Sequence, residues 1–158
     1  LFEEQIEHEE VELDALLEIA DRRMYGPGAT VFVPFEDALP TLQSLKHRGI
    51  KLAVVSNWDF SLHRVLETTG LAAMFDVVIA SLEEGIEKPD PRVFSLALER
   101  AGVDAAEALH VGDDLLDDVQ GARSAGMKAV LLDRSLRHRR RGMISSLRQI
   151  EEVLEEST

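Results

Sequence analysis

A cluster of acidic side chains is the part of this sequence best suited to chemistry. Asp113, Asp114, Asp117 and Asp118 place four carboxylates within six positions, directly after an apolar run. Crowded carboxylates repel one another unless a cation neutralises them, and Mg²⁺ prefers a few carboxylates plus water and substrate oxygens. Helix capping also explains Asp114 or Asp117. Four acids exceed what a cap needs, so the cluster predicts a metal site.

Two further polar groups follow other apolar runs. Ser56 and Asn57 offer a hydroxyl and an amide that can donate hydrogen bonds to a phosphoryl oxygen, although this pair is also ordinary capping chemistry before a helix. Lys88 stands beside Pro89 and Pro91, which stiffen the segment that directs it. An ammonium held inward offsets the charge of both a phosphate and nearby carboxylates. The plainer alternative is a surface lysine before a helix.

The elements that position these groups alternate along the chain. Continuous apolar runs predict buried strands, and three-and-four spacing predicts helices between them. This alternation predicts an α/β fold, a Rossmann-like parallel sheet with helices on both faces. Ligands of such sheets bind beyond the carboxyl ends of the strands, so one pocket can collect all three groups. The predicted strands are 50–55, 75–80, 108–111 and 129–132, and the predicted helices are 38–45, 62–69, 91–101, 115–125 and 143–155.

The first residues of the chain have a different character. Residues 13–24 show the spacing of an amphipathic helix, which Gly26-Pro27-Gly28 ends. They precede the alternation of strands and helices. Residues 1–28 are therefore predicted to be a helical appendage, and residues 29–158 the α/β core.

Composition excludes several classes of protein. The chain has 158 residues, 45% of them hydrophobic, so it can bury one core. A formal net charge of -13 argues against a nucleic-acid partner, whose phosphates would be repelled. No apolar run reaches the roughly 20 residues of a membrane span, and an acidic start is unlike a signal peptide. We therefore expect a soluble, cytoplasmic protein. The absence of cysteine excludes disulfides and thiolate chemistry.

Three motifs together resemble the second, third and fourth motifs of the haloacid dehalogenase-like (HAD) hydrolase superfamily, in its phosphatase type. The resemblance extends over approximately residues 35–155, and the order and spacing of the motifs match as well. It implies a HAD-like Rossmann core, often with an inserted helical cap, and hydrolysis through an aspartyl-phosphate intermediate that uses Mg²⁺. The motifs are Val54-Val55-Ser56-Asn57, Lys88-Pro89-Asp90-Pro91 and Gly112-Asp113-x4-Asp118-x2-Gly121-Ala122.

The resemblance also implies roles for individual residues. Ser56 would bind the transferred phosphoryl group and Asn57 would assist through its amide. Lys88 would steady the nucleophile and the phosphate of a small phosphorylated metabolite. Asp113 would coordinate Mg²⁺, and Asp118 would serve as second-shell support or a further metal ligand.

The first motif of the family, an Asp-x-Asp after the first strand, is absent. Asp14, Asp21 and Asp37 precede Ser56, but none follows a predicted strand. We therefore expect the chain to begin inside the cap, with residues 1–28 as its last helix, an expectation with which a first residue other than methionine agrees. The parent protein is expected to be a hydrolase, and this chain alone to be inactive.

Without this first strand, the predicted sheet is incomplete. In the family that strand lies between the strands that here end at Ser56 and Gly112, so a central gap is predicted. Backbone groups beside such a gap lack partners unless another segment supplies them.

Two other functions remain open. A metal-free haloacid dehalogenase shares the fold, but its carboxylate substrate does not require a cation-binding acid cluster. A truncated, non-catalytic binding module is the other alternative, favoured by the absent nucleophile. The sequence argues against a dinucleotide-binding function, because no Gly-x-Gly-x-x-Gly follows a predicted strand.

Overall fold

The computed structural model describes residues 32–135 and 142–155. The chain divides into two compact units, Leu1–Val33 and Pro34–Thr158, and the second contains the helices and strands described below. The helix predicted over residues 13–24 and the assignment of residues 1–28 to a cap lie outside the described residues. Within the described ranges, no helix is long and apolar enough to cross a membrane.

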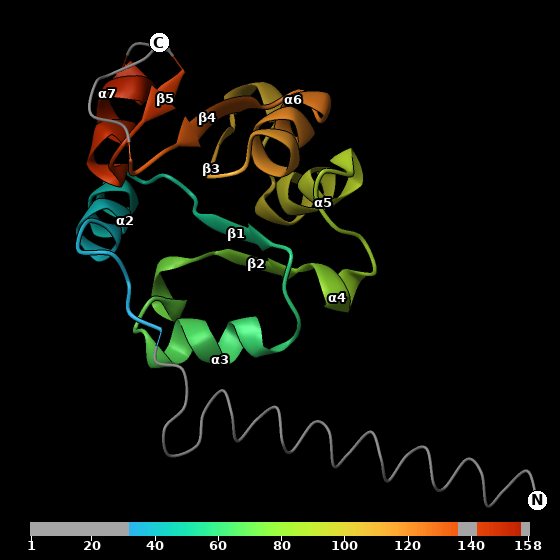
Figure 1. Cartoon of the computed structure of the whole chain (residues 1–158), viewed down its shortest axis with the longest axis horizontal. Helices are drawn as coiled ribbons and strands as arrows, with labels where there is room; N and C mark the ends of the chain where they lie inside the picture. Colours follow the sequence, from blue (N-terminus) through green and yellow to red (C-terminus); the bar gives the residue numbers. More distant parts are fainter. Residues whose placement is uncertain (1–31, 136–141, 156–158) are drawn as a thin grey trace, which may run out of the picture. The chain divides into compact units, whose positions relative to one another are not determined.

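The strands of the described residues form two parallel sheets (Figure 1). In the first, β1 (Ala53–Ser56) pairs with β2 (Val77–Ala80). In the second, β3 (Leu109–Gly112) pairs with β4 (Lys128–Leu132), and β4 pairs with β5 (Met143–Ile144). The predicted α/β class with parallel strands is confirmed, and β5 is an additional strand.

Helical segments separate the strands from β1 to β4 along the chain, as predicted. Asp90 caps the central helix by accepting a hydrogen bond from the Arg92 amide, and Pro91 occupies the first helical position, where its missing N–H costs nothing. The helices are α2 (Ala38–His47), α3 (Ser61–Thr68), α4 (Ser81–Glu84), α5 (Pro91–Ala101), α6 (Gly121–Ser124) and α7 (Ile150–Glu155), with a π-helical turn η3 (Leu115–Gln120) and 3₁₀ turns η1 (Ala72–Met74), η2 (Ala105–Glu107) and η4 (Leu147–Gln149).

Two helix predictions need correction. The continuous helix predicted over 143–155 is wrong, because its first residues form β5 beside β4. Ser146 then starts a new helical segment: its hydroxyl accepts from the Arg148 amide, and the Gln149 side chain accepts from the Ser146 amide. The helix predicted over 115–125 consists of a π-helical turn followed by α6. Apolar spacing alone does not distinguish these cases.

One helix supports both sheets. Val93 and Phe94 of α5 are fully buried and share a core with Val55 of β1, Ile79 of β2 and Ala129 of β4. On the opposite face, α3 covers β1 and β2, whereas α2 and α7 cover β4 and β5. Helices therefore cover both faces, as predicted.

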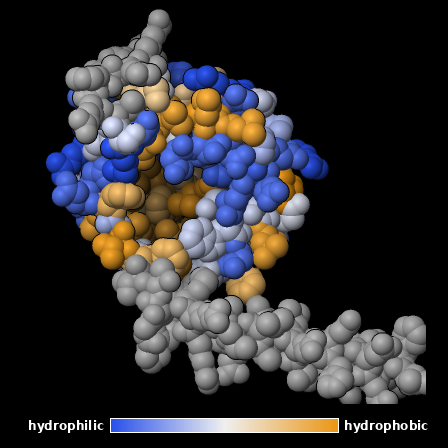
Figure 2. All heavy atoms as spheres, viewed as in Figure 1, coloured by the Kyte–Doolittle hydropathy of each residue, from blue (hydrophilic) through white to orange (hydrophobic). Residues whose placement is uncertain are grey.

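The sheet is interrupted between β1 and β3. Within the described ranges, each of these strands pairs on one side only. The break falls between the strands that end at Ser56 and Gly112, where the family resemblance implies a gap. Three of the four residues of β2 are buried, whereas none of β1 or β3 is. The residues of β1 and β3, the strands beside the break, are therefore only partly shielded from solvent. The view in Figure 2 shows a hollow in this part of the molecule, lined by hydrophobic side chains.

Candidate active site

Lys88 and Asp118 form an ion pair near the carboxyl end of β3. The Lys88 Nζ donates to Asp118 Oδ1 over 2.6 Å. The two side chains are only 12% and 4% exposed, respectively. Because little water reaches the pair, removal of one partner leaves an uncompensated charge, which is costly.

Asp118 receives two further hydrogen bonds. His110 Nε2 lies 3.1 Å from the same Oδ1, and the Asp114 amide donates to Oδ2 over 2.9 Å. Burial raises the pKa of the Asp118 carboxyl, but the bonds from His110, Lys88 and Asp114 outweigh burial and hold this pKa well below its ordinary value of 3.8. Asp118 is therefore a fixed, charged acceptor that orients the Lys88 ammonium.

Two glycines of the motif at residues 112–122 permit this arrangement. A Cβ on Gly112 would overlap the Asp118 carboxyl group, so only glycine lets that side chain fold back against β3. A Cβ on Gly121 would lie 2.8 Å from Phe94 Cε2 and 3.0 Å from the Pro89 carbonyl oxygen. Glycine there allows α6 to approach the segment that carries Lys88.

Asn57 holds the backbone of Lys88. Its Oδ1 accepts from the Lys88 amide over 2.8 Å, and its Nδ2 donates to the Lys88 carbonyl over 2.9 Å. A longer contact of 3.5 Å joins Nδ2 to Asp117 Oδ2. The amide therefore links the end of β1 to the lysine segment, a role that the sequence analysis did not anticipate.

Ser56 and Asp113 remain available to a ligand. Ser56 is half-buried at the end of β1, and Asp113 is exposed after β3. Within residues 32–135 and 142–155, neither side chain has a hydrogen-bond partner. Asp113 lines a cavity of about 600 Å³ at the ends of β3 and β4, together with Val111, Gly112 and residues 131–135.

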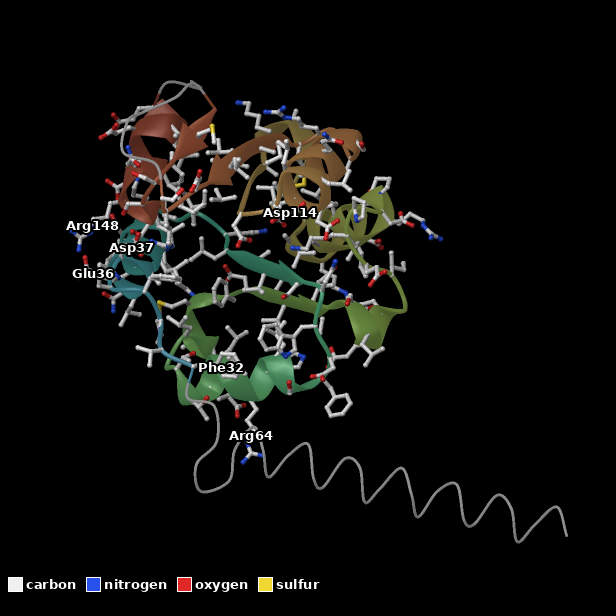
Figure 3. The ribbon with its side chains drawn as sticks, in the orientation of Figure 1. Phe32, Glu36, Asp37, Arg64, Asp114 and Arg148 are labelled. Atoms are coloured by element: carbon white, nitrogen blue, oxygen red, sulfur yellow. The ribbon has the colours of Figure 1, made fainter. Side chains whose placement is uncertain are left out.

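Asp114 caps the η3 turn. Its Oδ1 accepts from the amides of Leu116 and Asp117 over 2.7 Å each. Figure 3 shows Asp114 where β3 gives way to this turn. The capping alternative therefore explains Asp114.

The described residues do not by themselves make up a metal site. No group of three histidine, aspartate or glutamate side chains in this part of the chain is placed to hold a metal. Both Asp118 oxygens accept hydrogen bonds, whereas the Asp113 carboxylate has no hydrogen-bond partner among the described residues. Mg²⁺ often takes one or two carboxylates and completes its shell with water and substrate oxygens. Asp113 fits one position of such a shell.

Sequence reasoning missed the contact of His110 with Asp118. The His110 ring packs edge-on against Phe94, with centroids 5.0 Å apart. The alternation of side chains along a strand was the available signal. Leu109 and Val111 belong to the core on the other side of β3, so His110 faces α5.

Comparison with known proteins places these features in a family. A family model described as haloacid dehalogenase-like hydrolase matches residues 2–126. The chain is 45% identical over 104 residues to a phosphoserine phosphatase of Thermus thermophilus, which covers 65% of this chain and 42% of that protein. The matched segments span about two-fifths of the length of the curated relatives.

Solved structures show the same fold. A HAD phosphatase from Thermococcus onnurineus superimposes with a TM-score of 0.71 and 36% identity, over 76% of this chain and 57% of that one. A 2-haloacid dehalogenase from Pseudomonas syringae gives a TM-score of 0.66 at 36% identity, over 78% of this chain and 54% of that one. Enzymes that act on different substrate classes thus share this architecture.

Proposed function

Because the chain belongs to the haloacid dehalogenase-like hydrolase family, we propose that it carries part of the active site of a Mg²⁺-dependent phosphomonoester hydrolase. The observation that supports this most is the buried Lys88–Asp118 pair, which Asn57 ties to the end of β1. The substrate class is a small phosphorylated metabolite, as for the Thermus thermophilus phosphoserine phosphatase.

The proposed role of each residue combines its surroundings with what the family resemblance implies. Asp118 holds the Lys88 ammonium, which offsets the charge of the phosphoryl group and of the attacking carboxylate. Asn57 positions the backbone of Lys88, and the Ser56 hydroxyl donates to a phosphoryl oxygen. Asp113 is a ligand of Mg²⁺, which when bound would neutralise charge on the phosphate.

The nucleophile of the proposed aspartyl-phosphate route is not supplied by the described residues. Among the described residues, Asp37 is the aspartate that precedes Ser56. It does not follow a strand, as the nucleophile of the family does, and it is only 3% exposed. Its oxygens accept from Arg134 and Ser146. We therefore propose that this chain by itself does not turn over.

Metal-independent dehalogenation is the second candidate, supported by the structural similarity to the Pseudomonas syringae enzyme. The available Asp113 carboxylate favours the phosphatase. A cation beside it would attract a phosphate dianion, whereas a haloacid carboxylate has no need of that cation.

A chimera tests the reaction. The N-terminal portion of the Thermococcus onnurineus phosphatase that precedes the matched region is joined to this chain. Release of phosphate from a panel of phosphomonoesters is then measured with Mg²⁺ and with EDTA. Asp113→Asn and Lys88→Met are each expected to lower the rate by roughly 100-fold. The control variants Asp104→Asn and Lys128→Met change the same residue types at other positions, and they should release phosphate at the rate of the unmodified chimera.

Two outcomes contradict the proposal. A folded chimera that releases no phosphate from the whole panel would exclude the phosphatase. Chloride release from 2-chloropropionate in EDTA would favour the dehalogenase. For the metal role, Mg²⁺ titration calorimetry of this chain should show weak binding that Asp113→Asn removes, and equal heats would exclude Asp113 as a ligand.

A further inference from the structure

His110 is a polar side chain at a position where an apolar ring would also pack. It lies in β3, paired with Ala129 of β4, and its side chain is only 14% exposed. Its ring meets the fully buried Phe94 of α5 edge-on, with the two rings inclined at 84°. Burial of an imidazole costs free energy unless it is hydrogen-bonded. The contact with Asp118 offsets that cost, which gives the histidine a physical reason.

The hydrogen bond between His110 and Asp118 has one possible direction. Asp118 faces the Lys88 ammonium at 2.6 Å, so its carboxyl is ionised and its oxygens can only accept. His110 Nε2 lies 3.1 Å from the same Oδ1 and must therefore carry a hydrogen. His110 is thus the donor of this bond, and Asp118 is the acceptor.

Three donors occupy the acceptor positions of Asp118. Each oxygen of an ionised carboxylate offers two lone-pair directions. The Asp114 amide bonds to Oδ2, whereas the side chains of His110 and Lys88 share Oδ1. With His110 on one lone pair of Oδ1, the ammonium is left with the other. The histidine therefore restricts where the Lys88 Nζ lies.

The Lys88 ammonium depends on this restriction, because little else fixes its direction. Asn57 holds the Lys88 backbone at both its amide and its carbonyl. Within the described residues, the Nζ has no hydrogen-bond acceptor other than Asp118. A lysine side chain has about 2 kcal/mol of rotamer entropy. The contact at its tip, rather than the anchored backbone, therefore decides where the charge points.

We propose that His110 is a positioning residue: by occupying one lone pair of Asp118 Oδ1, it directs the Lys88 ammonium toward the anion that the site binds. His110 acts through Asp118 and does not need to touch that anion. The inference rests on the proposed function only for the identity of the anion, a phosphoryl group. The direction of the ammonium is a property of the chain itself and can be measured without a substrate.

Nuclear magnetic resonance of the full 158-residue chain, labelled with ¹³C and ¹⁵N, tests the two steps separately. Long-range ¹H–¹⁵N spectra identify which ring nitrogens carry a hydrogen, and His110 Nε2 should carry one. The two Cε hydrogens of Lys88 report on its side chain. A lysine held in one conformation gives them different chemical shifts, whereas averaging brings the shifts together. Separate signals are expected for Lys88.

Variants of His110 separate hydrogen bonding from packing. His110→Phe removes the donor but keeps a ring beside Phe94, so the two Lys88 signals should merge while the amide spectrum shows a folded chain. His110→Gln restores an amide donor of similar reach and should separate the signals again. His63→Phe makes the same substitution in the exposed histidine beside Glu83 and should leave Lys88 unchanged.

The phosphatase chimera connects the position of Lys88 with the proposed reaction. There, His110→Phe should lower kcat about tenfold, a factor typical of one hydrogen bond. KM should change little, because a misdirected ammonium loses stabilisation of the transition state. His110→Gln should recover most of that loss. An unchanged kcat in His110→Phe, whatever the change in KM, would contradict a positioning role.

Three results from the spectra would overturn the proposal. One is a wild-type His110 ring with hydrogen on Nδ1 alone, which decides the question even if His110→Phe does not fold. Another is merged Lys88 signals in the wild type, or separate signals in folded His110→Phe. The third is a His110→Gln chain whose signals stay merged, which assigns the effect to packing. A chimera without any hydrolysis removes the phosphatase, whereas the Lys88 spectra still decide the role of His110.

Discussion

Two buried aspartates, Asp118 and Asp37, use the same chemistry in different parts of the molecule. Each is 3% exposed and accepts hydrogen bonds from a cationic side chain and a backbone amide. Asp118 lies among residues of the candidate active site. Asp37 lies beside α2, close to Glu36 and Arg148 (Figure 3).

Asp37 joins three segments of the chain. Both of its oxygens accept from Arg134, at 2.9 Å and 3.1 Å, and Oδ2 also accepts from the Ser146 hydroxyl and the Leu147 amide. The Arg134 guanidinium lies 3.8 Å from the centroid of the Phe35 ring. Hydrogen bonds from Arg134 hold the pKa of Asp37 well below 3.8 against the opposing effect of burial.

The difference between the two clusters lies in the cation. Arginine presents a planar fork that matches both oxygens of Asp37 and fixes the contact. Lys88 makes one bond to Asp118 and keeps other donor hydrogens for a second anion. The Asp37 cluster is therefore built for stability, and the Asp118 cluster can stabilise the fold while presenting a charge to a ligand.

Acidification should have the largest effect, because it removes both charges. Both aspartates have lowered pKa values in the folded chain, so below about pH 5 the unfolded chain binds more protons. The free energy of unfolding should be constant above that pH and fall as the pH drops through 3.8. Urea denaturation at successive pH values measures this. A fall of the same size in the double variant Asp37→Asn/Asp118→Asn would contradict the assignment.

Asp37→Asn should cost about 3 kcal/mol of unfolding free energy, because Arg134 loses its charged partner while partly buried. Urea denaturation at neutral pH provides the measurement. Asp104→Asn, at an exposed position without a side-chain capping bond, serves as the control and should match the wild type. A cost below that of an ordinary surface substitution would show that Asp37 does not hold the three segments together.

Lys88→Met should cost less, about 2 kcal/mol, because one charge-assisted hydrogen bond is lost while His110 and the Asp114 amide still contact Asp118. The test of function is separate: the chimera described above should lose activity in this variant but keep it in Asp37→Asn at a temperature where both remain folded. Equal loss of activity in the two variants would remove the distinction between the clusters.

His110→Gln should have the smallest effect, about 1 kcal/mol, because it disturbs one hydrogen bond to Asp118 and an edge contact with Phe94. Thermal unfolding monitored by circular dichroism measures it. His63→Gln, in an exposed contact with Glu83, is the matched control and should change little. A larger loss than in Lys88→Met would mean that His110, rather than Lys88, dominates the Asp118 cluster.

Local patterns predicted much of the fold because they reflect local physics. The helix at 91–101 is confirmed at both ends, since Asp90, Pro91 and Gly102 mark them within the sequence. The segment at 143–155 was mispredicted because the pairing of β5 with β4 depends on a neighbour, whereas apolar spacing describes only the segment itself. The sheet break could be predicted only through the family resemblance, since no local pattern specifies strand order.

The sequence by itself determined which polar groups stand at the ends of apolar strands, because strand and turn preferences act over a few residues. Only the tertiary structure decided which contacts these groups make. Asn57 forms hydrogen bonds with the Lys88 backbone, and Asp118 contacts both Lys88 and His110. Asp37 pairs with Arg134, 97 positions away. Such contacts join distant segments, and the packing of helices against the two sheets, rather than any local preference, brings those segments within hydrogen-bonding distance.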